Sequence, residues 1–298
     1  MRDINLRNVT VDAPLAASML PRRPEWANKG SFGRALLAVG SSEYRGAAYL
    51  AAEAALRAGC GYVEIWTEKS LADNMVSTLP EIIYHTRNSF DMLTDIDINR
   101  FLERSAKASA ILVGCGCGRS KGLLKLVIAL LSEGGSPLVL DADAINVISE
   151  SDEAKALLRS AARPVVLTPH PLEMSRLARL PVSDIEADRE GVALEFAREY
   201  GVTLLLKGKG SVITDGERSF INTTGSTALA KAGSGDALAG ALVSLVSAGA
   251  DPIYATVIAA YIHGAAGDRL SDVYSDYGVT PSDLPREMAK EIKRLCEM

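Results

Sequence analysis

The sequence predicts an α/β protein built on a mostly parallel β-sheet with helices on both faces. Short apolar runs alternate with segments of helical periodicity along most of the 298 residues, which is typical of repeated strand–helix–strand units. The composition agrees, because 48% of the residues are hydrophobic and only 5% are aromatic, so small aliphatic side chains must fill the core. A turn signal late in the chain, Asp215-Gly216, predicts an antiparallel hairpin at the edge of the sheet.

The first strand–helix–strand unit begins near residue 35. An apolar run at 35–39 ends at Gly40, and apolar residues at helical spacing then continue to Gly59. The next strand is expected at 62–67. Later apolar runs predict further strands at 111–114, 137–141, 165–168 and 203–207.

The alternation changes in the last third of the chain. Ser183-Asp184-Ile185-Glu186 fits a capping box and predicts the start of one helix that continues to Gly201. Runs at 211–214 and 219–222 flank the hairpin turn. No repeat and no linker rich in Pro, Gly or Ser interrupts the chain, so we expect a single domain over 20–298 after an N-terminal extension, 1–19.

Charge and hydrophobicity exclude several classes of protein. The net charge of -5, without a dense Lys/Arg cluster, argues against a nucleic-acid partner. Residues 1–15 lack the apolar stretch of a signal peptide, and the longest apolar segment, 237–250, is too short to span a bilayer. The four cysteines do not form a disulfide framework. We therefore expect a cytoplasmic protein with reduced thiols and no membrane partner.

The strongest local motif lies at 223–236. Thr223-Thr224-Gly225 is followed by Ala232-Gly233-Ser234-Gly235-Asp236 and then by a run of small apolar residues. Glycines let a backbone approach a ligand, and the N–H groups at a helix N-terminus bind phosphate. An acid beside phosphate suits proton transfer, so Asp236 is predicted to be a base that acts on a hydroxyl. The alternative is an acid that only stabilises the start of a helix.

These motifs resemble two nested groups of proteins. The segment 222–236 with its following helix resembles the ribokinase-like superfamily, which implies a three-layer sandwich around the predicted sheet. Further blocks, in the same order as in the family, are similar to those of the NAD(P)H-hydrate dehydratases: 29–33, 40–41, 44–47, 54–59, 168–174, 206–211 and 261–268. The resemblance runs from about Leu20 to the end of the chain.

The resemblance implies a repair reaction on hydrated NADH or NADPH. The S form of the hydrated ring would be phosphorylated on its hydroxyl by ADP, or by ATP, with Mg²⁺, and would then lose phosphate. Asp236 would take the hydroxyl proton, while Gly233, Ser234 and Gly235 would stabilise the phosphoryl group. ADP is the expected donor, because the compact chain resembles the prokaryotic members.

The resemblance also assigns binding residues. Lys207, Gly208, Lys209, Gly210 and Ser211 match the stretch that holds AMP, although a turn with solvated lysines is the alternative. The residues expected to contact the hydrated dinucleotide, besides Asp236, are Gly46, Ala47, Gly116 and His170. On the sequence alone His170 is as readily structural as functional.

Acids and cysteines near this site leave metal binding open. Glu173 resembles an acid that lies near magnesium and phosphate, or else it is a first-turn helix acid. Asp141 and Asp143 either shape the site or hold water around magnesium, and neither is predicted to be catalytic. Cys115 and Cys117 replace the non-glycine residues of a family loop, and no further Cys or His stands at metal-ligand spacing.

Two other functions remain open on the sequence. A kinase of the same superfamily acting on a vitamin-precursor alcohol would share Asp236 and the glycine turn, and a nucleotide-binding module without chemistry would share the turn alone. Relatives of the dehydratase are often homotetramers. The matching epimerase would be a separate protein, because the chain is too short to contain it.

Overall fold

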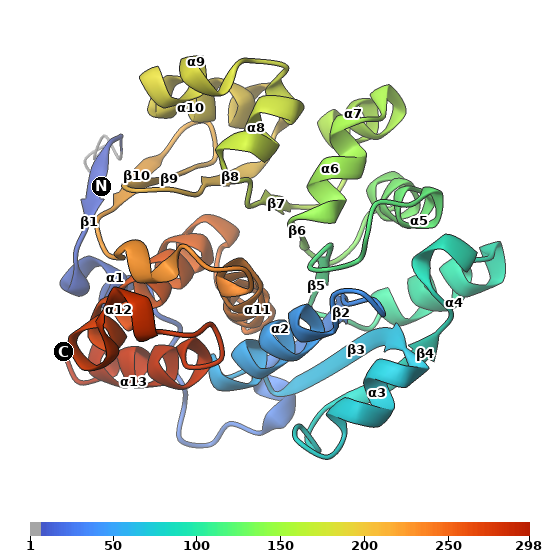
Figure 1. Ribbon diagram of the computed structural model, residues 1–298, viewed down its shortest axis with the longest axis horizontal. Coiled ribbons are helices and arrows are strands. Elements are labelled where there is room, and N and C mark those ends of the chain that lie inside the picture. Colours follow the sequence, from blue (N-terminus) through green and yellow to red (C-terminus); the bar gives the residue numbers. More distant parts are fainter. Residues whose placement is uncertain (1–6) are drawn as a thin grey trace.

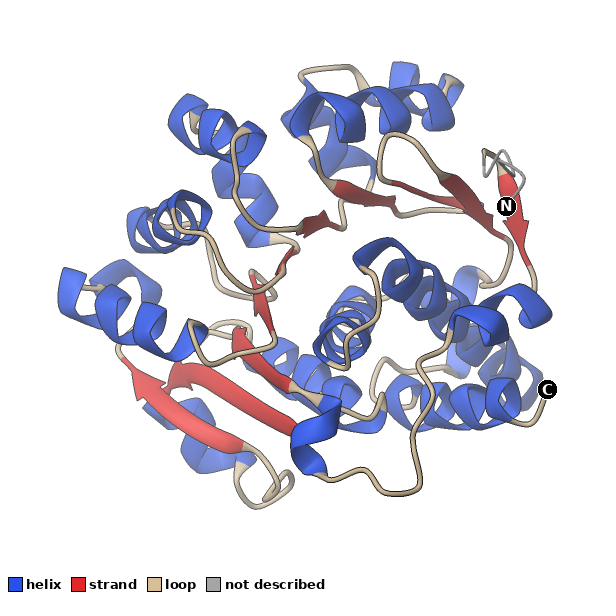
Figure 2. Cartoon of the chain, turned by 180° about the vertical axis from the view of Figure 1, so that it is seen from behind, coloured by secondary structure: helices blue, strands red, loops and turns tan. Residues whose placement is uncertain are grey.

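The computed structural model describes residues 7–298 and shows a three-layer α/β sandwich (Figure 1). The strands, in chain order, are β1 Val9–Val11, β2 Arg34–Ala38, β3 Tyr62–Glu68, β4 Ile83–Arg87, β5 Ala110–Val113, β6 Leu138–Leu140, β7 Val165–Leu167, β8 Thr203–Leu206, β9 Ser211–Thr214 and β10 Ser219–Asn222. They form one 10-stranded sheet in the order β1-β10-β9-β8-β7-β6-β5-β2-β3-β4. Figure 2 shows this curved sheet from behind, between its two helical layers.

Helices cover both faces of the sheet. One layer contains α1 Ala13–Met19, α2 Arg45–Arg57, α3 Lys69–Met75, α11 Ser234–Ser247, α12 Pro252–Gly278 and α13 Leu284–Cys296. The other contains α4 Asp95–Ser105, α5 Lys121–Ser132, α6 Asp143–Ser149, α7 Asp152–Arg159, α8 Pro171–Ala178, α9 Val182–Ala187 and α10 Arg189–Tyr200. Short 3₁₀ turns lie at Lys29–Phe32, Phe90–Met92 and Thr227–Leu229.

The alternation of side chains along each strand builds two apolar cores. In β2, Leu37 packs into the core shared with α2 and α11, whereas Leu36 packs into the core on the opposite face. Helices α2 and α11 lie so close that a Cβ atom on Gly240 would overlap the carbonyl of Ala51. Small residues in α11 therefore allow the contact that places its N-terminus at the edge of the sheet.

The predicted fold class is confirmed. Pairs within the series β8-β7-β6-β5-β2-β3-β4 are parallel, and β9 pairs antiparallel with both β8 and β10. The predicted strands match the observed ones to within one or two residues at each end. Two strands were not predicted: β4, in which His85 and Arg87 hide the apolar pattern, and the three-residue β1.

The prediction of one helix from Ser183 to Gly201 is wrong. The segment forms α9 and α10, and the chain breaks between them at Asp188, whose side chain accepts a hydrogen bond from the backbone N–H of Gly191. Ser183 lies inside α9, which starts after Pro181 without a side-chain cap. An Asp side chain offers the backbone an alternative partner, and here it starts a new helix.

The segment predicted to be an N-terminal extension packs against the rest of the fold. Residues 1–6 of it lie outside the described part. From Val9, β1 pairs in parallel with β10, and α1 packs against α12 and α13. The boundary between extension and domain at residue 20 stays a prediction.

Within residues 7–298, no helix combines the length and the apolar character needed to cross a lipid bilayer.

Candidate active site

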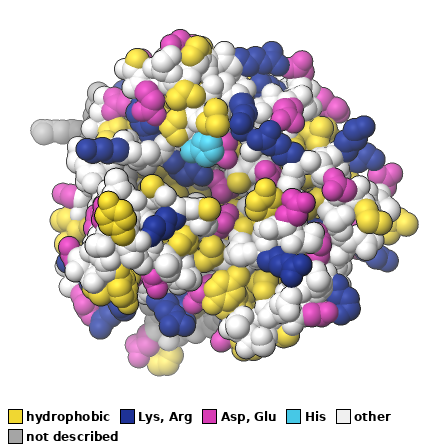
Figure 3. Space-filling view, viewed as in Figure 1, with side chains coloured by type: hydrophobic (Ala, Val, Ile, Leu, Met, Phe, Trp, Pro, Cys, Tyr) yellow, Lys and Arg dark blue, Asp and Glu magenta, His cyan; other side chains and the backbone are white. Residues whose placement is uncertain are grey.

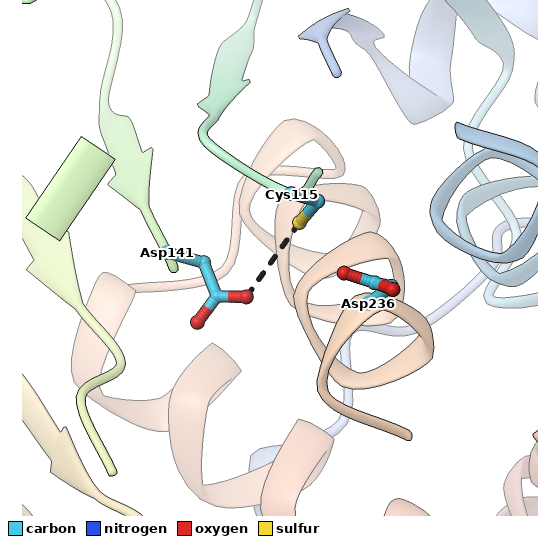
Figure 4. A group of neighbouring side chains, drawn as sticks. All are labelled: Cys115, Asp141 and Asp236. Atoms are coloured by element: carbon cyan, nitrogen blue, oxygen red, sulfur yellow. Dashed lines mark hydrogen bonds between the residues drawn. The ribbon is translucent and has the colours of Figure 1, made fainter. Parts of the chain in front are cut away.

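The polar residues of the candidate site follow the carboxyl ends of neighbouring parallel strands. Cys115 follows β5, Asp141 follows β6, Thr168 follows β7 and Lys207 follows β8. Open α/β sheets place ligands at this edge, because the loops after parallel strands converge there. The N-terminus of α11, which carries Asp236, faces the same edge (Figure 4).

Asp141 organises the centre of this cluster. Its Oδ1 atom accepts hydrogen bonds from Lys207 Nζ at 2.9 Å and from Thr168 Oγ1 at 2.6 Å. The Cys115 thiol donates to its Oδ2 atom at 3.6 Å. Asp141 is 2% exposed, so these partners compensate the cost of burying its carboxylate.

Lys207 is a buried, paired cation. Burial lowers its pKa, but the negative charges of Asp141 and Glu173 more than offset this, and the net shift is upward. Its ammonium group therefore stays charged at the edge of the sheet. The alternative of a solvated turn lysine is wrong for Lys207, since its side chain is only 20% exposed and bonds to Asp141.

The environment of Asp236 suits a general base. Burial, and then repulsion from the charge of Asp141, raise its pKa from 3.8 to about 7, against the opposing effect of Lys207. A carboxyl with a pKa near the working pH exchanges protons most effectively. Ligand atoms of Cys115, Asp141 and Asp236 lie within 4.8 Å of one another, so the charge of Asp141 acts on Asp236 at short range.

The first turn of α11 presents free backbone donors. Gly233 precedes the helix with a φ of 104°, and no side chain caps the helix start. Within the described chain, the N–H groups of Gly235 and Asp236 have no hydrogen-bond partner. A Cβ atom on Gly233 would lie 2.7 Å from a methyl of Leu50, so only glycine fits here. Free N–H groups at a helix start are what the predicted phosphate-binding turn requires.

A cavity of about 640 Å³ adjoins this turn. Five loop or helix segments line it: β8 with its following turn, the loop after β10, the 3₁₀ turn at Thr227–Leu229, the start of α11 and the middle of α12. Among the predicted nucleotide residues, the cavity is lined by Lys207, Gly208, Lys209, Ser211, Ser234 and Gly235. Gly210 and Gly233 belong to the same two turns but are not lining residues.

The residues predicted to contact the dinucleotide come together in part. Gly46 and Ala47 lie in the first turn of α2, and a Cβ atom on Gly116 would lie 2.6 Å from that of Ala47. Gly116 has a φ of 60°, which favours glycine. Beside Gly46 the space is open, because a Cβ atom there would meet nothing within 4 Å.

His170 and Glu173 form the capping box of α8. Nδ1 of His170 accepts hydrogen bonds from the N–H groups of Leu172 and Glu173, at 3.1 and 3.3 Å, so the ring proton is on Nε2. Glu173 accepts from the N–H of His170 at 2.8 Å. Burial foremost lowers the pKa of His170 and raises that of Glu173. Both residues thus have a local structural role, while 46% of the His170 side chain stays exposed.

The cluster does not fit Mg²⁺ as an all-protein cage. Mg²⁺ takes octahedral oxygen ligands, whereas Cys115 offers sulfur and Asp141 is held by Lys207 and Thr168. Within residues 7–298, Asp236 has no ion-pair partner, whereas Asp141 is paired with Lys207. The residues suit a Mg²⁺ ion whose ligands are mostly nucleotide phosphates and water.

Sequence reasoning missed Thr168 and the backbone beside Asp141. Ala142 has φ 48° and ψ -112°, an unfavourable conformation for a residue with a side chain. This strain turns the chain sharply between β6 and α6 and keeps Asp141 at the sheet edge. The available signal was their position: Thr168 and Asp141 each directly follow an apolar strand.

Charged residues of both signs are mixed over the face shown in Figure 3, without a continuous basic surface. A mostly parallel three-layer sandwich, with free N–H groups and an acid at the start of α11 and an adjoining cavity, is typical of the ribokinase-like class of proteins. The sequence profile of the NAD(P)H-hydrate dehydratases matches residues 35–292. The chain belongs to the NAD(P)H-hydrate dehydratase family.

Curated relatives agree with this assignment. The chain is 33% identical to the ADP-dependent (S)-NAD(P)H-hydrate dehydratase of Bacillus subtilis, over 92% of this chain and 94% of that protein. It is 34% identical to the bifunctional NAD(P)H-hydrate repair enzyme of Thermofilum pendens, over 93% of this chain and 53% of that protein. The chain thus spans about half the length of the bifunctional relatives it matches.

Solved structures show the same fold. The Bacillus subtilis ADP/ATP-dependent NAD(P)H-hydrate dehydratase co-crystallised with ATP/Mg²⁺ matches with a TM-score of 0.84 and 29% identity, over 97% of this chain and 99% of that one. A hydroxyethylthiazole kinase from Pyrococcus horikoshii matches with a TM-score of 0.60 and 16% identity, over 95% of this chain and 92% of that one. The second likeness shows the shared fold alone.

Proposed function

We propose that the protein restores NADH and NADPH from the S form of their hydrated derivatives, with ADP as the phosphate donor. The observation that carries the proposal is the position of Asp236, whose pKa is raised to about 7, beside free N–H donors and a nucleotide-sized cavity. The names of relatives that match nearly the whole chain support the substrate and the donor.

In the proposed reaction, Asp236 accepts the proton of the ring hydroxyl as its oxygen attacks the terminal phosphorus of ADP. AMP leaves, and the N–H groups of Gly235 and Asp236 stabilise the charge on the transferred group. Lys207 supplies a fixed positive charge close to Gly235, where a Cβ atom would lie 3.5 Å from its Nζ atom. Elimination of phosphate, with loss of a proton from the neighbouring ring carbon, then restores the double bond.

The two substrates would lie on either side of the α11 turn. We assign the nucleotide to Lys207–Ser211 and Gly233–Gly235, and the hydrated dinucleotide to Gly46, Ala47, Gly116 and His170. Mg²⁺ bound to the phosphates would neutralise part of their charge, with Glu173 near it. The exposed half of His170 and the open space at Gly46 support the second assignment.

The function is tested by incubating the protein with purified S-hydrated NADH and Mg²⁺, with ADP, with ATP or without nucleotide. We expect the absorbance of the reduced nicotinamide to recover with ADP, and AMP and phosphate to form in equal amounts. A kinase for a vitamin-precursor alcohol would instead convert hydroxyethylthiazole and ATP into a stable phosphate ester. Family membership disfavours this alternative. Faster recovery with ATP than with ADP would reverse the choice of donor.

The proposal extends to the surroundings of the enzyme. We place it in the cytoplasm, as a homotetramer, and we expect an epimerase activity to supply the S form. The name of the bifunctional relatives supports a linked second activity. Light scattering tests the tetramer, and the R-hydrated form tests the epimerase, because this chain alone should leave that form unchanged.

A further inference from the structure

The middle of α12 holds one wall of the nucleotide cavity. Asn222 Nδ2 donates to the carbonyl of Ala260 at 3.3 Å, and Thr224 Oγ1 donates to that of Tyr261 at 3.0 Å. About two turns later, Asp268 accepts from the N–H of Gly225 at 2.9 Å. The loop after β10 is thus fastened to α12 along about two helical turns.

The same helix also reaches the opposite wall, through His263. Nε2 of His263 lies 3.0 Å from the carbonyl oxygen of Ser234, the first residue of α11. A carbonyl oxygen only accepts, so Nε2 carries the ring proton and donates it. His263 is 8% exposed, and burial lowers its pKa to about 4, so the imidazole is neutral near pH 7.

The first turn of α11 has little other support from side chains. No side chain caps its start, and the buried hydroxyl of Ser234 has no partner among the described residues. In the described chain, the bond from His263 is the only side-chain hydrogen bond to the backbone of residues 233–236. This turn carries the free N–H groups and Asp236.

We infer that His263 is a positioning residue, which fixes the first turn of α11 relative to the nucleotide wall and thereby holds Asp236 in line with the phosphate. The inference deepens the proposed function and rests on it for its kinetic consequence. Orientation contributes strongly to such reactions, since a displacement of about 1 Å can lower a rate by about 10²-fold. His263 lines the cavity, but its hydrogen bond goes to the backbone of α11, so its loss should lower turnover more than nucleotide affinity.

The test compares three variants. His263→Leu removes the donor, and His263→Gln keeps an N–H donor on a side chain of similar reach. Thr256→Val is the matched control on the same helix, because Thr256 is fully buried and its hydroxyl donates only to the carbonyl of Pro252, at 2.7 Å. Each variant is measured for unfolding, for kcat and KM with S-hydrated NADH and ADP, and for the AMP dissociation constant.

We expect His263→Leu to lower kcat by about 10- to 100-fold, with little change in the AMP dissociation constant. His263→Gln should recover most of this loss, and Thr256→Val should leave kcat unchanged. Amide hydrogen exchange at Ser234 and Ala237, whose N–H groups are bonded, should become faster in His263→Leu alone. Equal losses in His263→Leu and Thr256→Val, or normal exchange at these two amides in His263→Leu, would overturn the inference.

The exchange measurement also separates this inference from the proposed function. If the unmodified protein does not convert hydrated NADH, the proposed function fails. The effect of His263 on the exchange of α11 and on AMP binding is measured without that substrate. It would still decide whether His263 fixes this turn.

Discussion

The folded environment of Asp236, the proposed catalytic base, is unfavourable for its ionised form. Burial and the neighbouring charge of Asp141 keep its carboxyl close to half-ionised near neutral pH, while Lys207 prevents a still larger shift. Lys207 in turn stays charged because Asp141 and Glu173 surround it. The proton affinity of the candidate base is therefore a property of the group of residues.

Asp236→Asn should abolish most turnover and preserve binding. Asn keeps the size of the side chain but cannot take the hydroxyl proton, so kcat should fall by about 10²- to 10⁴-fold. The AMP dissociation constant, measured by calorimetry on the same preparation, should stay within a few-fold of the original. Near-normal turnover would refute the role of Asp236, and lost AMP binding would place its effect in the nucleotide site.

As the pH rises, Asp236→Asn should become more stable than the unmodified protein. The folded pKa of about 7 is above the ordinary 3.8, so the folded state favours the protonated form. The contribution of Asp236 to the free energy of unfolding is fully present below about pH 4 and is lost as the pH rises through 7. The Asn side chain does not ionise, so the variant keeps this contribution. It should be more stable than the unmodified protein at pH 8 by about 1–3 kcal/mol, after allowance for partial solvent screening.

Urea unfolding at pH 4 and pH 8 measures this effect, and the advantage of the Asn variant should appear only at the higher pH. If Asp236 were merely a helix-terminal acid, the substitution would instead cost up to about 1 kcal/mol at pH 8.

The pH dependence of turnover should follow the same group. Activity should rise with pH through an apparent pKa near 7, because only the ionised Asp236 accepts the hydroxyl proton. Asp141→Asn should move this limb to lower pH by removing the strongest charge that opposes ionisation. Asp143→Asn is the matched control, since Asp143 has the smaller effect on the pKa of Asp236. Equal displacement in both variants would contradict this account.

At the scale of elements, the turn between β8 and β9 links the sheet to the nucleotide cavity. Gly208 and Gly210 have φ values of 147° and 65°, and Arg189 donates to the carbonyls of Leu206 and Lys207 at 3.1 Å each. These contacts hold the backbone in a shape that brings Lys207, Gly208 and Lys209 to the cavity.

Gly210→Val should weaken nucleotide binding more than it weakens folding. The matched control is Gly201→Val, because Gly201 has a φ of 64° in open space at the end of α10. Each variant should lose about 1–2 kcal/mol of unfolding free energy from the left-handed conformation. Only Gly210→Val should raise the AMP dissociation constant, by about 10-fold or more, which is about 1.4 kcal/mol. Equal affinities in the two variants would show that the segment is only a turn.

At the scale of the whole molecule, the site is built where the two helical layers meet one edge of the sheet. Helix α11 comes from one layer, while α8 and the loops after β5 and β6 lead into the other. The N-terminal segment supports this arrangement from the far end of the sheet. Thr223, which starts the loop after β10, donates to the carbonyl of Val11 in β1 at 3.3 Å.

Deletion of residues 1–19 should therefore lower both stability and nucleotide affinity. It removes β1 and α1, exposes the edge of β10 and uncovers the apolar surface of α12 and α13 that α1 covers. We expect a fall of several degrees in Tm and weaker AMP binding, measured by calorimetry. Thr223→Val, which removes only the bond to Val11, should show a smaller loss of both. An unchanged Tm in the truncated protein would mean that 1–19 is a true extension.

The sequence by itself determined the order of the strand–helix units along the chain and the hairpin, and it predicted the glycine turn before α11 and Asp236 as parts of the site. These features are local: they depend on the period of apolar residues, on glycines at particular backbone positions and on short motifs. The same reasoning was wrong for the helix expected from Ser183 to Gly201. The Asp188 side chain caps a new helix and so divides the segment into α9 and α10.

Only the tertiary structure decided the chemistry around Asp236. Asp141 and Lys207 are 66 residues apart in the chain and bond at 2.9 Å, and His263 reaches Ser234 from a helix 29 residues away. The pKa near 7 of Asp236 likewise comes from burial and from the charge of Asp141. Electrostatic energies depend on distance and on exclusion of water, and both are set by the packing of strands and helices, which residue spacing does not encode.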